Sequence, residues 1–467
     1  MSLKNRMLEP TILSVSLLTI MASAAVAPAL GKIRLAFPGV DETLIKLVLT
    51  LPPLFIIPFS LLTGWLVYRV KKKTIMIIGL IIYFLAGIGG GFARNITELL
   101  VIRAILGMGV GLIMPLSTTL VGDFFTGEAR SKVMGYAVSV QNLGGVIFQI
   151  AAGYLAVMSW RYSFGVYSMA FIILILIMLF LPEPVRVTPK EGQKSKARLP
   201  FKVYLCAILC VLNMVVFYSV LTNLAILLET ERQLFVSESA LFKGKEDLAR
   251  HIEAGTISEI TRSAFKDNNI MLSDKAYVKP AEAQNSWEIL DKNKKYIVKK
   301  EDNKLVIRVE RLGKAAVVGY LLSLLSLSAM VSGIFFNRIM AVMRRFAVPL
   351  AILLMGVGFG VLGNASNLLM IFIAMIVIGL NFGVIQPYIF LFVQKFTPQD
   401  SRALGMAVVG SAIFLGQFLS PIVLGAVSAI SGQTSIYFKF NFCAGAVAIA
   451  GLIGLALAMR PVETVKA

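Results

Sequence analysis

The stretch from Arg103 to Pro115 reads RAILGMGVGLIMP and holds two glycines four residues apart, followed by a proline. The stretch GLNFGVIQP, from Gly379 to Pro387, repeats this spacing at an offset of 272 residues. Positions downstream of both stretches keep the same offset. The pairs are Gly107 with Gly379, Gly111 with Gly383, Pro115 with Pro387, Arg130 with Arg402, Gly144 with Gly416, and Gly153 with Gly425. One offset shared by so many positions indicates that the chain consists of two related halves.

The composition is typical of an integral membrane protein. Hydrophobic residues make up 57% of the 467-residue chain and charged residues 15%, with a mean hydropathy of +0.82. Soluble domains carry about 25% charged residues. The formal net charge is +20, and the basic residues fall in short loops between apolar segments. This distribution indicates orientation in the membrane and contact with lipid, and it argues against nucleic acid as a partner.

Twelve apolar segments have lengths close to or above the roughly 20 residues that a helix needs to cross a bilayer core. The predicted spans cover residues 9–31, 43–68, 74–93, 98–121, 133–157, 163–181, 202–228, 313–336, 347–364, 368–393, 404–430 and 436–459. We therefore predict an all-α membrane protein of two pseudo-symmetric six-helix bundles. The N-terminal bundle is residues 1–181, the linker 182–200, and the C-terminal bundle 201–228 with 313–467.

Basic residues concentrate in alternate loops, and this pattern predicts the orientation of the spans. The loop at Lys71 to Lys73, the loop at Arg130 and the linker all lie on the basic side. Because basic loops stay in the cytoplasm, both termini and the linker are predicted to be cytoplasmic, in a plasma membrane.

The segment 229–312 is soluble in composition and interrupts the second half after its first span. We predict that it forms a small α+β domain outside the membrane, on the side opposite the linker. Its first part, from Ser237 to about Phe265, has a partial helical stripe. Its last part contains short runs typical of strands. These runs are Trp287–Leu290, Lys295–Val298 and Leu305–Val309, with a turn at Glu301–Lys304.

Two six-span halves joined by a cytoplasmic linker resemble the major facilitator superfamily. The loop after the second span matches a family motif, although Tyr68 and Lys71 replace the family's Asp and Gly. The matching residues are Gly64, Leu66, Arg69, Lys72 and Lys73, with a weaker repeat at Gly333, Phe335, Asn337 and Arg338. Other residues similar to the family are Glu128, Arg130, Trp160, Arg161, Asp400 and Arg402. The resemblance implies alternating access, with Gly64, Arg69, Gly333 and Arg338 helping to latch the cytoplasmic gate.

Within that superfamily, the drug:proton antiporter branch shows the nearest resemblance. The residues that carry it are Arg103, Gly107 and Gly111 in the fourth span, Gly135, Gly144 and Gly153 in the fifth, and Gly416, Pro421 and Gly425 in the eleventh. Phe148 and Gln149 stand where the fifth-span motif of the branch has Gly-Pro. The resemblance implies export of amphipathic compounds, with protons as the coupling ion.

The repeated glycines and prolines have a structural interpretation. Glycines at four-residue spacing let membrane helices approach closely, so Gly107, Gly111, Gly379 and Gly383 are predicted to serve helix packing. Such faces would also slide against one another during a conformational change. Pro115 and Pro387 are predicted to kink or end their helices.

Arg103 is the clearest candidate for a functional charge within a span. An intramembrane charge is costly and usually functional, which predicts contact with an anionic substrate group or coupling to protonation. The alternative is that Arg103 reaches the interface or binds a backbone carbonyl.

The remaining candidate substrate contacts are polar but uncharged, because no carboxylate lies deep inside a predicted span. Asp41 and Glu42 fall at the outer end of the second span, and Asp123 is predicted to lie beside Arg130 or Lys132. The uncharged candidates are Gln141, Asn142, Gln149, Asn213, Asn223, Asn381, Gln386 and Gln417. Aromatic and thioether neighbours such as Phe217, Phe382 and Met406 suit amphipathic ligands.

The sequence predicts no enzyme: it shows no catalytic constellation, no phosphate-binding loop and no metal-ligand spacing, so no cofactor is expected. The first hypothesis is a monomeric secondary transporter that exports amphipathic small molecules. The second is a carrier of an anionic or neutral metabolite or a lipid through Arg103. The third is a membrane receptor or scaffold that acts through the segment 229–312.

Overall fold

The computed structural model describes residues 3–184, 199–230, 236–242, 277–280, 286–291, 294–301, 304–311, 314–398 and 401–459. The chain divides into two compact units. The larger unit comprises Met1–Leu227, Ala315–Ala365 and Leu369–Ala467, and it holds the predicted spans. The smaller unit comprises Leu228–Lys314 with Ser366–Leu368.

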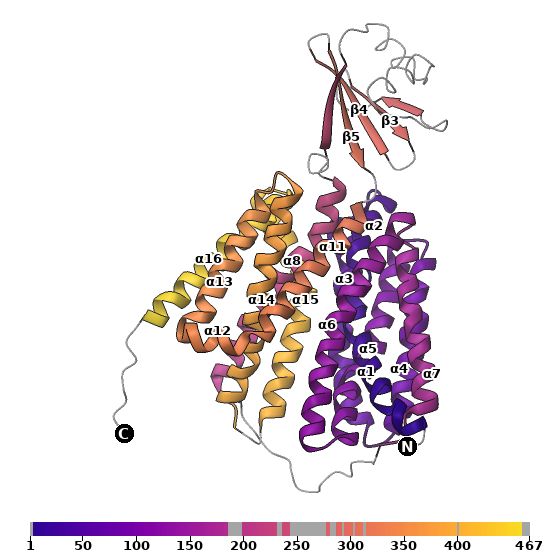
Figure 1. Cartoon of the computed structure of the whole chain (residues 1–467), viewed down its shortest axis with the longest axis vertical. Helices are drawn as coiled ribbons and strands as arrows, with labels where there is room; N and C mark the ends of the chain where they lie inside the picture. The colour runs from indigo at the N-terminus through magenta and orange to yellow at the C-terminus, as the bar shows by residue number, and fades with distance from the viewer. Residues whose placement is uncertain are drawn as a thin grey trace. The chain divides into compact units, whose positions relative to one another are not determined.

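The larger unit is helical, and Figure 1 shows the first half in indigo to magenta and most of the second in orange to yellow. The first half contains α1 (Leu3–Ala24), η1 (Ala27–Ala29), α2 (Leu30–Ala36), α3 (Glu42–Leu66), α4 (Lys72–Gly89), η2 (Gly90–Phe92), α5 (Ile96–Phe124), α6 (Gly127–Met158), η3 (Tyr162–Ser168) and α7 (Met169–Phe180). The second half contains α8 (Phe201–Thr230), α11 (Lys314–Ile334), α12 (Phe336–Met343), η5 (Arg344–Phe346), α13 (Ala347–Gly363), α14 (Leu368–Phe396), α15 (Arg402–Ser431) and α16 (Ile436–Met459).

Within the described residues, 11 helical segments are long and apolar enough to cross a membrane. They correspond to the predicted spans from the second to the twelfth. The predicted first span is helical as α1, but its apolar helical stretch, Met7–Leu18, is shorter. The predicted count of twelve spans is therefore supported for all spans except the first.

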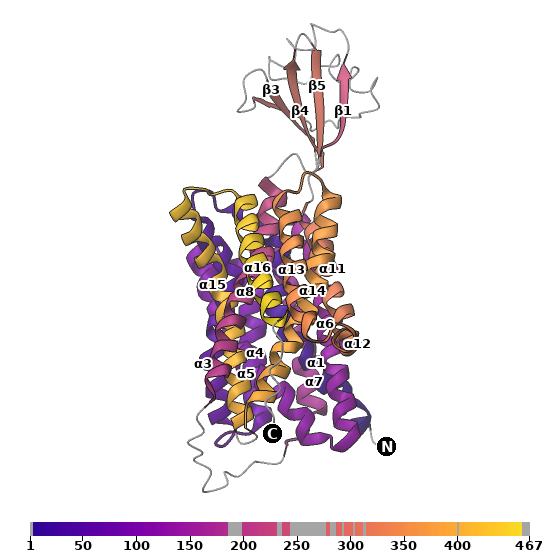
Figure 2. The same cartoon turned by 90° about the vertical axis from the view of Figure 1, so that its left-hand side faces the viewer.

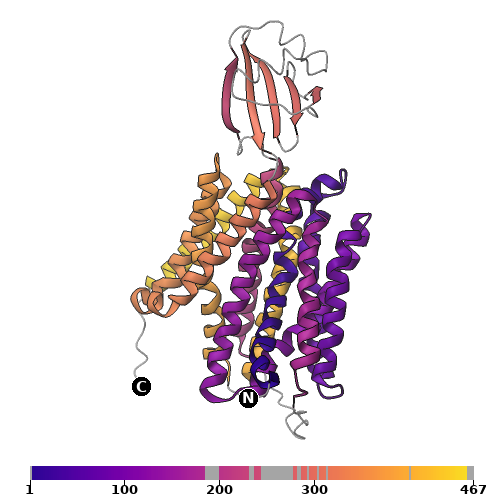
Figure 3. The ribbon, with the colours of Figure 1, turned by 45° about the vertical axis from the view of Figure 1, so that its right-hand side comes forward.

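We name the two ends of the helical unit by the chain segments that leave them. The end at which α8 finishes and α11 begins is the insert end, and the end at which α7 finishes and α8 begins is the linker end (Figure 3). The N-terminus of α1 lies at the linker end (Figure 1). That both termini are cytoplasmic remains a prediction.

Side-chain caps determine where two helices begin. Asn95 Oδ1 accepts from the Glu98 N–H at 2.8 Å at the start of α5, and Glu98 accepts from the Arg94 N–H at 2.8 Å. Asp41 Oδ1 accepts from the Thr43 N–H at 2.8 Å at the start of α3. These bonds satisfy N–H groups that a helix start leaves free.

The prolines do not end their helices. Pro115 lies inside α5 and Pro387 inside α14, and both helices continue for about two turns beyond them. The prediction that these prolines could end a helix is therefore wrong. Packing by neighbouring helices allows proline within a membrane helix, since nearby groups satisfy the freed carbonyl.

The repeated glycines pack at equivalent places in the two halves. In the first half, a Cβ on Gly107 would overlap the Pro52 carbonyl of α3, and one on Gly111 would lie 2.6 Å from the Phe59 Cβ. In the second half, Gly379 and Gly383 lie just as closely against α11. Their contacts there include the carbonyl oxygens of Leu325 and Ala329. The predicted packing role of these glycines agrees with these distances.

The smaller unit contains a five-stranded antiparallel sheet with strand order β1-β5-β4-β3-β2 (Figure 2). The strands are β1 (Val236–Phe242), β2 (Tyr277–Pro280), β3 (Ser286–Asp291), β4 (Lys294–Glu301) and β5 (Lys304–Arg311). The register aligns Trp287 with Val298, and Val298 with Ile307.

The strand predictions are confirmed for the runs within β3, β4 and β5. The predicted helix from Ser237 is wrong at its start, because Val236–Phe242 forms β1 and pairs with β5. Long-range pairing overrides a weak local helical pattern in so short a segment. The rest of that predicted helix, and the predicted flexible centre of the linker, lie outside the described residues.

Candidate functional site

The two halves meet at the insert end through α6 and α11, which lie side by side in Figures 1 and 2. A Cβ on Gly153 would lie 2.8 Å from the Ala315 carbonyl oxygen. Ser323 Oγ donates to the Val146 carbonyl at 3.0 Å, and Ser326 Oγ donates to Gln149 Oε1 at 3.3 Å. Gln149, a predicted substrate contact, therefore bridges the two halves in this conformation.

A second junction between the halves surrounds the start of α3. Gly425 of α15 faces Thr43, with 3.2 Å between a Cβ placed on Gly425 and Thr43 Oγ1. Gly425 and Gly153 occupy equivalent positions in the repeat, and both lie where one half contacts the other. The other repeat pair in these helices stays within its own half. Gly144 packs on Leu17 of α1 and Gly416 on Met214 of α8.

Nearer the linker end, glycines of the same helices have no close neighbour. A Cβ on Gly64 of α3, Gly135 of α6 or Gly410 of α15 would meet no other atom within 4 Å. Trp65 is also exposed there. The contacts between the halves described above therefore lie toward the insert end.

Arg103 lies in the interior of the first half, with 0% of its surface exposed. Its Nε donates to the Val48 carbonyl at 2.8 Å and its Nη1 to Tyr167 Oη at 2.8 Å, while Nη2 donates to the Ala22 carbonyl. The guanidinium thus joins α1, α3 and η3. These contacts support the structural alternative for Arg103, in which it binds backbone carbonyls, and they do not support contact with substrate.

A charged cluster joins the halves at the insert end, and the sequence prediction did not include it. Glu42 accepts a hydrogen bond from Lys439 of α16 at 3.0 Å and another from Lys46, one turn along α3. Lys46 also donates to Asn223 Oδ1 of α8. Lys46 is 3% exposed and Lys439 is 6% exposed. The signal that could have found this cluster is the presence of two lysines one turn inside apolar spans.

Two of the predicted polar residues, Asn213 and Gln386, each lie one turn from an aromatic stack between α8 and α14, and we call these four residues the polar seam. Phe217 stacks on Phe382 with ring centroids 3.7 Å apart and planes 15° from parallel. Asn213 lies one turn from Phe217, and Gln386 lies one turn from Phe382, in both cases toward the linker end. Asn213 Nδ2 and Gln386 Oε1 are buried without a hydrogen-bond partner in the protein.

The other predicted polar contacts are less clearly placed for binding. Asn381 Nδ2 donates to the Val377 carbonyl of its own helix at 2.7 Å, so its amide nitrogen is already hydrogen-bonded within the helix. Gln141 and Asn142 of α6 and Gln417 of α15 are half-buried. The structure therefore groups Asn213 and Gln386 and leaves the remaining candidates distributed over three helices.

The residues of the predicted gate lie at two levels: Gly64 and Arg69 are at or beyond the linker end of α3, whereas Gly333 lies beside the middle of α14. Arg69 sits over the Trp65 ring at 4.1 Å from its centroid, and Arg338 and Arg402 are exposed. Gly333 lies near Gly383: a Cβ placed on Gly333 would be 3.8 Å from the Gly383 carbonyl oxygen. Asp123 was expected beside Arg130 or Lys132. Its ion pair is instead with Lys72, at 2.7 Å.

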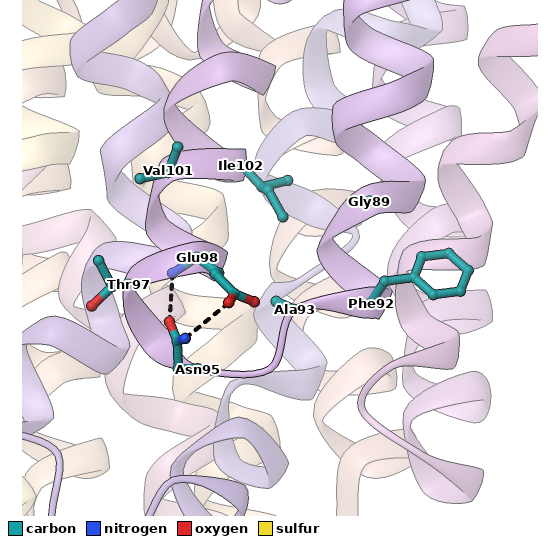
Figure 4. A pocket seen from close by; sticks show the side chains of 8 residues that line it. All are labelled: Gly89, Phe92, Ala93, Asn95, Thr97, Glu98, Val101 and Ile102. Atoms are coloured by element: carbon teal, nitrogen blue, oxygen red, sulfur yellow. Dashed lines mark hydrogen bonds between the residues drawn. The ribbon is translucent and has the colours of Figure 1, made fainter.

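A surface hollow of about 590 Å³ lies at the insert end of α4 and α5, within the first half (Figure 4). Glu98 and Asn95 face it, and their side chains are bonded to each other and to the helix start. Both side chains therefore form the N-terminal cap of α5. The hollow therefore lies apart from the junction between the halves and from the polar seam.

A model of the Major Facilitator Superfamily matches residues 12–242 and 305–467. This chain belongs to the Major Facilitator Superfamily. The matched residues include both six-helix halves and leave out most of the inserted segment, so the resemblance drawn from the loop motifs is confirmed.

Among curated proteins, the chain is similar to the multidrug transporter protein MdtP of Bacillus subtilis, with 32% identity over 104 residues. It is also similar to the quinolone resistance protein NorA of Staphylococcus aureus, with 27% identity over 170 residues. The arabinose-proton symporter of Escherichia coli strain K12 is 27% identical over 139 residues. The parts aligned with MdtP, NorA and the arabinose-proton symporter make up 22%, 36% and 30% of this chain, respectively. They make up only 19%, 43% and 29% of those relatives, in the same order.

Solved structures with this fold cover nearly the whole chain. The nucleoside transporter NupG covers 97% of this chain and 100% of its own, with a TM-score of 0.63 and 12% identity. The D-xylose-proton symporter covers 96% of each chain, with a TM-score of 0.61 and 13% identity. At such low identity these likenesses show the fold alone.

Proposed function

We propose that the protein exports amphipathic small molecules by alternating access, with protons as the coupling ion. The observation that carries this proposal is the polar seam formed by Asn213, Phe217, Phe382 and Gln386. It offers an aromatic stack beside an amide donor and an amide acceptor, and no charged residue belongs to it. Such a surface suits a ligand with both an apolar ring and hydrogen-bonding groups.

The contacts between the halves at each end of the helical unit support entry of the substrate from the linker end. The halves are in contact at the insert end, whereas Gly64, Gly135 and Gly410, nearer the linker end, have no neighbour within 4 Å of an added Cβ. In transporters with two related halves, rocking of one half against the other exposes a midplane site to each side in turn. In this proposal the linker end faces the cytoplasm of a plasma membrane, residues 229–312 lie outside, and the protein acts as a monomer.

The relatives favour export over uptake for this chain. MdtP is a multidrug transporter and NorA a quinolone resistance protein, whereas the arabinose-proton symporter is named for a sugar. An aromatic stack with an uncharged amide pair fits the first two better, because sugar binding would call for more polar groups around the ligand.

The two other hypotheses have weaker support. A carrier of anions through Arg103 requires a free guanidinium, and all three nitrogen positions of Arg103 donate within the first half. A receptor or scaffold would use the sheet unit. The equivalent glycines Gly153 and Gly425, each at a contact with the other half, favour movement between the halves instead.

The test uses inside-out membrane vesicles that contain the protein and carry a proton gradient. Tetraphenylphosphonium, chloramphenicol and benzoate are added in turn, representing a lipophilic cation, a neutral drug and an organic anion. We expect the cation or the neutral drug to collapse the gradient, and the Asn213→Leu variant to weaken the response. A response to benzoate alone would instead establish an anion carrier, and no response to any probe would contradict export.

A further inference from the structure

The buried charges at the insert end do not balance. Glu42 supplies one negative charge, while Lys46 and Lys439 supply two positive charges when both are protonated. Both lysines are almost fully buried, at 3% and 6% exposure. A buried ion is costly unless an opposite charge pairs with it, so one of the two ammonium groups lacks a counter-charge in this conformation.

The contacts of Lys46 fit a neutral amine. A neutral lysine keeps two N–H bonds, and the nitrogen of Lys46 has two acceptors, Glu42 Oε1 and Asn223 Oδ1. Lys439 then pairs with Glu42 as an ammonium ion. With Lys46 neutral, the cluster has no net charge, and the contacts between α3, α8 and α16 are all retained.

We propose that Lys46 is the proton-coupling residue of the transport cycle, and this inference rests on the proposed function. When the insert end closes, one N–H bond of the Lys46 ammonium breaks, the electron pair stays on Nζ, and the proton goes to water. When the insert end opens, water reaches Lys46 and Nζ takes a proton back. Glu42, Asn223 and Lys439 are positioning residues, because they hold Lys46 in the closed junction.

Among the described residues, Lys46 and Lys439 form ion pairs with Glu42 alone. Asp41, next to Glu42, is exposed and accepts from the Thr43 N–H at the start of α3. The nearest charged group on α5 is Arg103, which donates to the Val48 carbonyl two residues from Lys46. On α2 the charged residues are Lys32 and Arg34, and residues 10–24 of α1 and 416–431 of α15 carry no charge. On α8, Glu229 lies six residues beyond Asn223, nearly two turns along the helix.

The sign of the pH dependence follows from proton linkage. The closed insert end binds one proton fewer than the open insert end, so raising the pH favours closure and lowering it favours opening. One proton per transition changes the ratio of closed to open molecules by up to about tenfold per pH unit. A gate that opens on the acidic side of a membrane would take up a proton there.

The experiment measures the distance across the insert end with spin labels in lipid nanodiscs. One label replaces Arg94, in the loop before α5, and the other replaces Gln433, in the loop before α16; both positions are exposed. The native Cys206, Cys210 and Cys443 are buried and are replaced by alanine to leave only two labelling sites. The pH is varied from about 6 to 10, below the value near 10.4 at which free lysine titrates.

We expect the wild type to shift from the longer to the shorter distance as the pH rises. Lys46→Arg and Lys46→Gln should lose this shift, since arginine keeps its proton throughout the range and glutamine has none to lose. Lys73→Gln is the control, because Lys73 donates to the Met178 and Leu181 carbonyls at the linker end. It should shift like the wild type. An unchanged shift in Lys46→Arg, or no shift in the wild type, would overturn the proposal.

This experiment uses no substrate, so its outcome is separate from that of the transport test. A wild-type shift that depends on Lys46, combined with no transport of any probe, would contradict export and leave the proton-linked junction standing. Proton-coupled transport that persists at wild-type level in Lys46→Arg would contradict Lys46 as the coupling residue and leave export standing.

Discussion

A Cβ placed on Gly153 of α6 would lie 3.2 Å from the Cα of Gly319 in α11, so these helices touch backbone to backbone where the halves meet. In the same way, a Cβ placed on Gly319 would lie 2.6 Å from the Gln149 carbonyl oxygen. The repeat partner of Gly153, Gly425, lies at the other junction beside Thr43. The internal repeat thus places one glycine of each half at a contact with the other half.

The first prediction concerns Gly153→Leu. The added side chain would meet the Ala315 carbonyl, so closure of the insert end would require the backbones to move apart. Overpacking of this kind costs about 1–3 kcal/mol, which shifts the ratio of closed to open molecules by roughly 5- to 150-fold. We expect the spin-label pair across the insert end to report the longer distance at every pH, with transport reduced at least about tenfold. Gly165→Leu is the control, since a Cβ there meets no atom within 4 Å; equal distances in both variants would refute the prediction.

The second prediction concerns the paired packing glycines. Gly107→Val and Gly379→Val should each lower thermal stability in detergent by about 1–3 kcal/mol, because their added carbons would overlap carbonyl oxygens of α3 and α11. Gly445→Val, in an open position on α16, carries the same change in helix propensity without the overlap. Thermal unfolding of the three variants measures the difference. Similar melting temperatures for all three would show that these contacts relax without cost.

The sequence predicted the two halves well because a repeat with one offset does not depend on tertiary detail. The periodic spans and the glycine spacing are local features, and Gly107, Gly111, Gly379 and Gly383 pack as their spacing predicts. Arg130, a predicted neighbour of Asp123, lies beside Gly122, with its Nη2 3.2 Å from a Cβ placed there, but the sequence did not predict the ion-pair partner of Asp123. Its partner, Lys72, comes from a helix that begins 51 residues earlier.

The charged cluster could not be read from the sequence for a similar reason. Lys46 and Lys439 each lie about one turn inside a span, where a lysine usually extends to the membrane interface. Only the fold brings Lys439 to Glu42, across 397 residues. From the sequence, Arg103 could contact substrate or bind a backbone carbonyl. The choice between these roles depended on hydrogen-bond acceptors in α1, α3 and η3, which no local sequence pattern reveals.

The third prediction concerns Arg103. Arg103→Ala would remove the bond to the Val48 carbonyl, at about 1–3 kcal/mol for a buried group left unpaired, whereas Tyr167 keeps its bond to the Ala22 carbonyl. We expect a clear drop in melting temperature, with the preference among cationic, neutral and anionic probes unchanged in the protein that remains folded. Arg94→Ala, at an exposed position, should leave the melting temperature unaltered. A selective loss of anion transport at normal stability would restore Arg103 as a substrate contact.

The fourth prediction separates ligand binding from folding in the polar seam. Asn213 Nδ2 and Gln386 Oε1 are buried without partners in the protein, and an unpaired buried polar atom costs about 1–3 kcal/mol. Asn213→Leu and Gln386→Leu remove that cost, so both variants should unfold at the same temperature as the wild type or above it. Each also removes one hydrogen bond to the ligand, which should raise the KM for transport about tenfold, equivalent to ~1.4 kcal/mol. Asn364→Leu is the control, because Asn364 bonds to Gly360 and Asn441 at the end of α13 and should change stability without changing KM. A fall in stability without a rise in KM would show that Asn213 and Gln386 serve the packing of α8 and α14, and substrate recognition would then have to lie outside this seam of the second half.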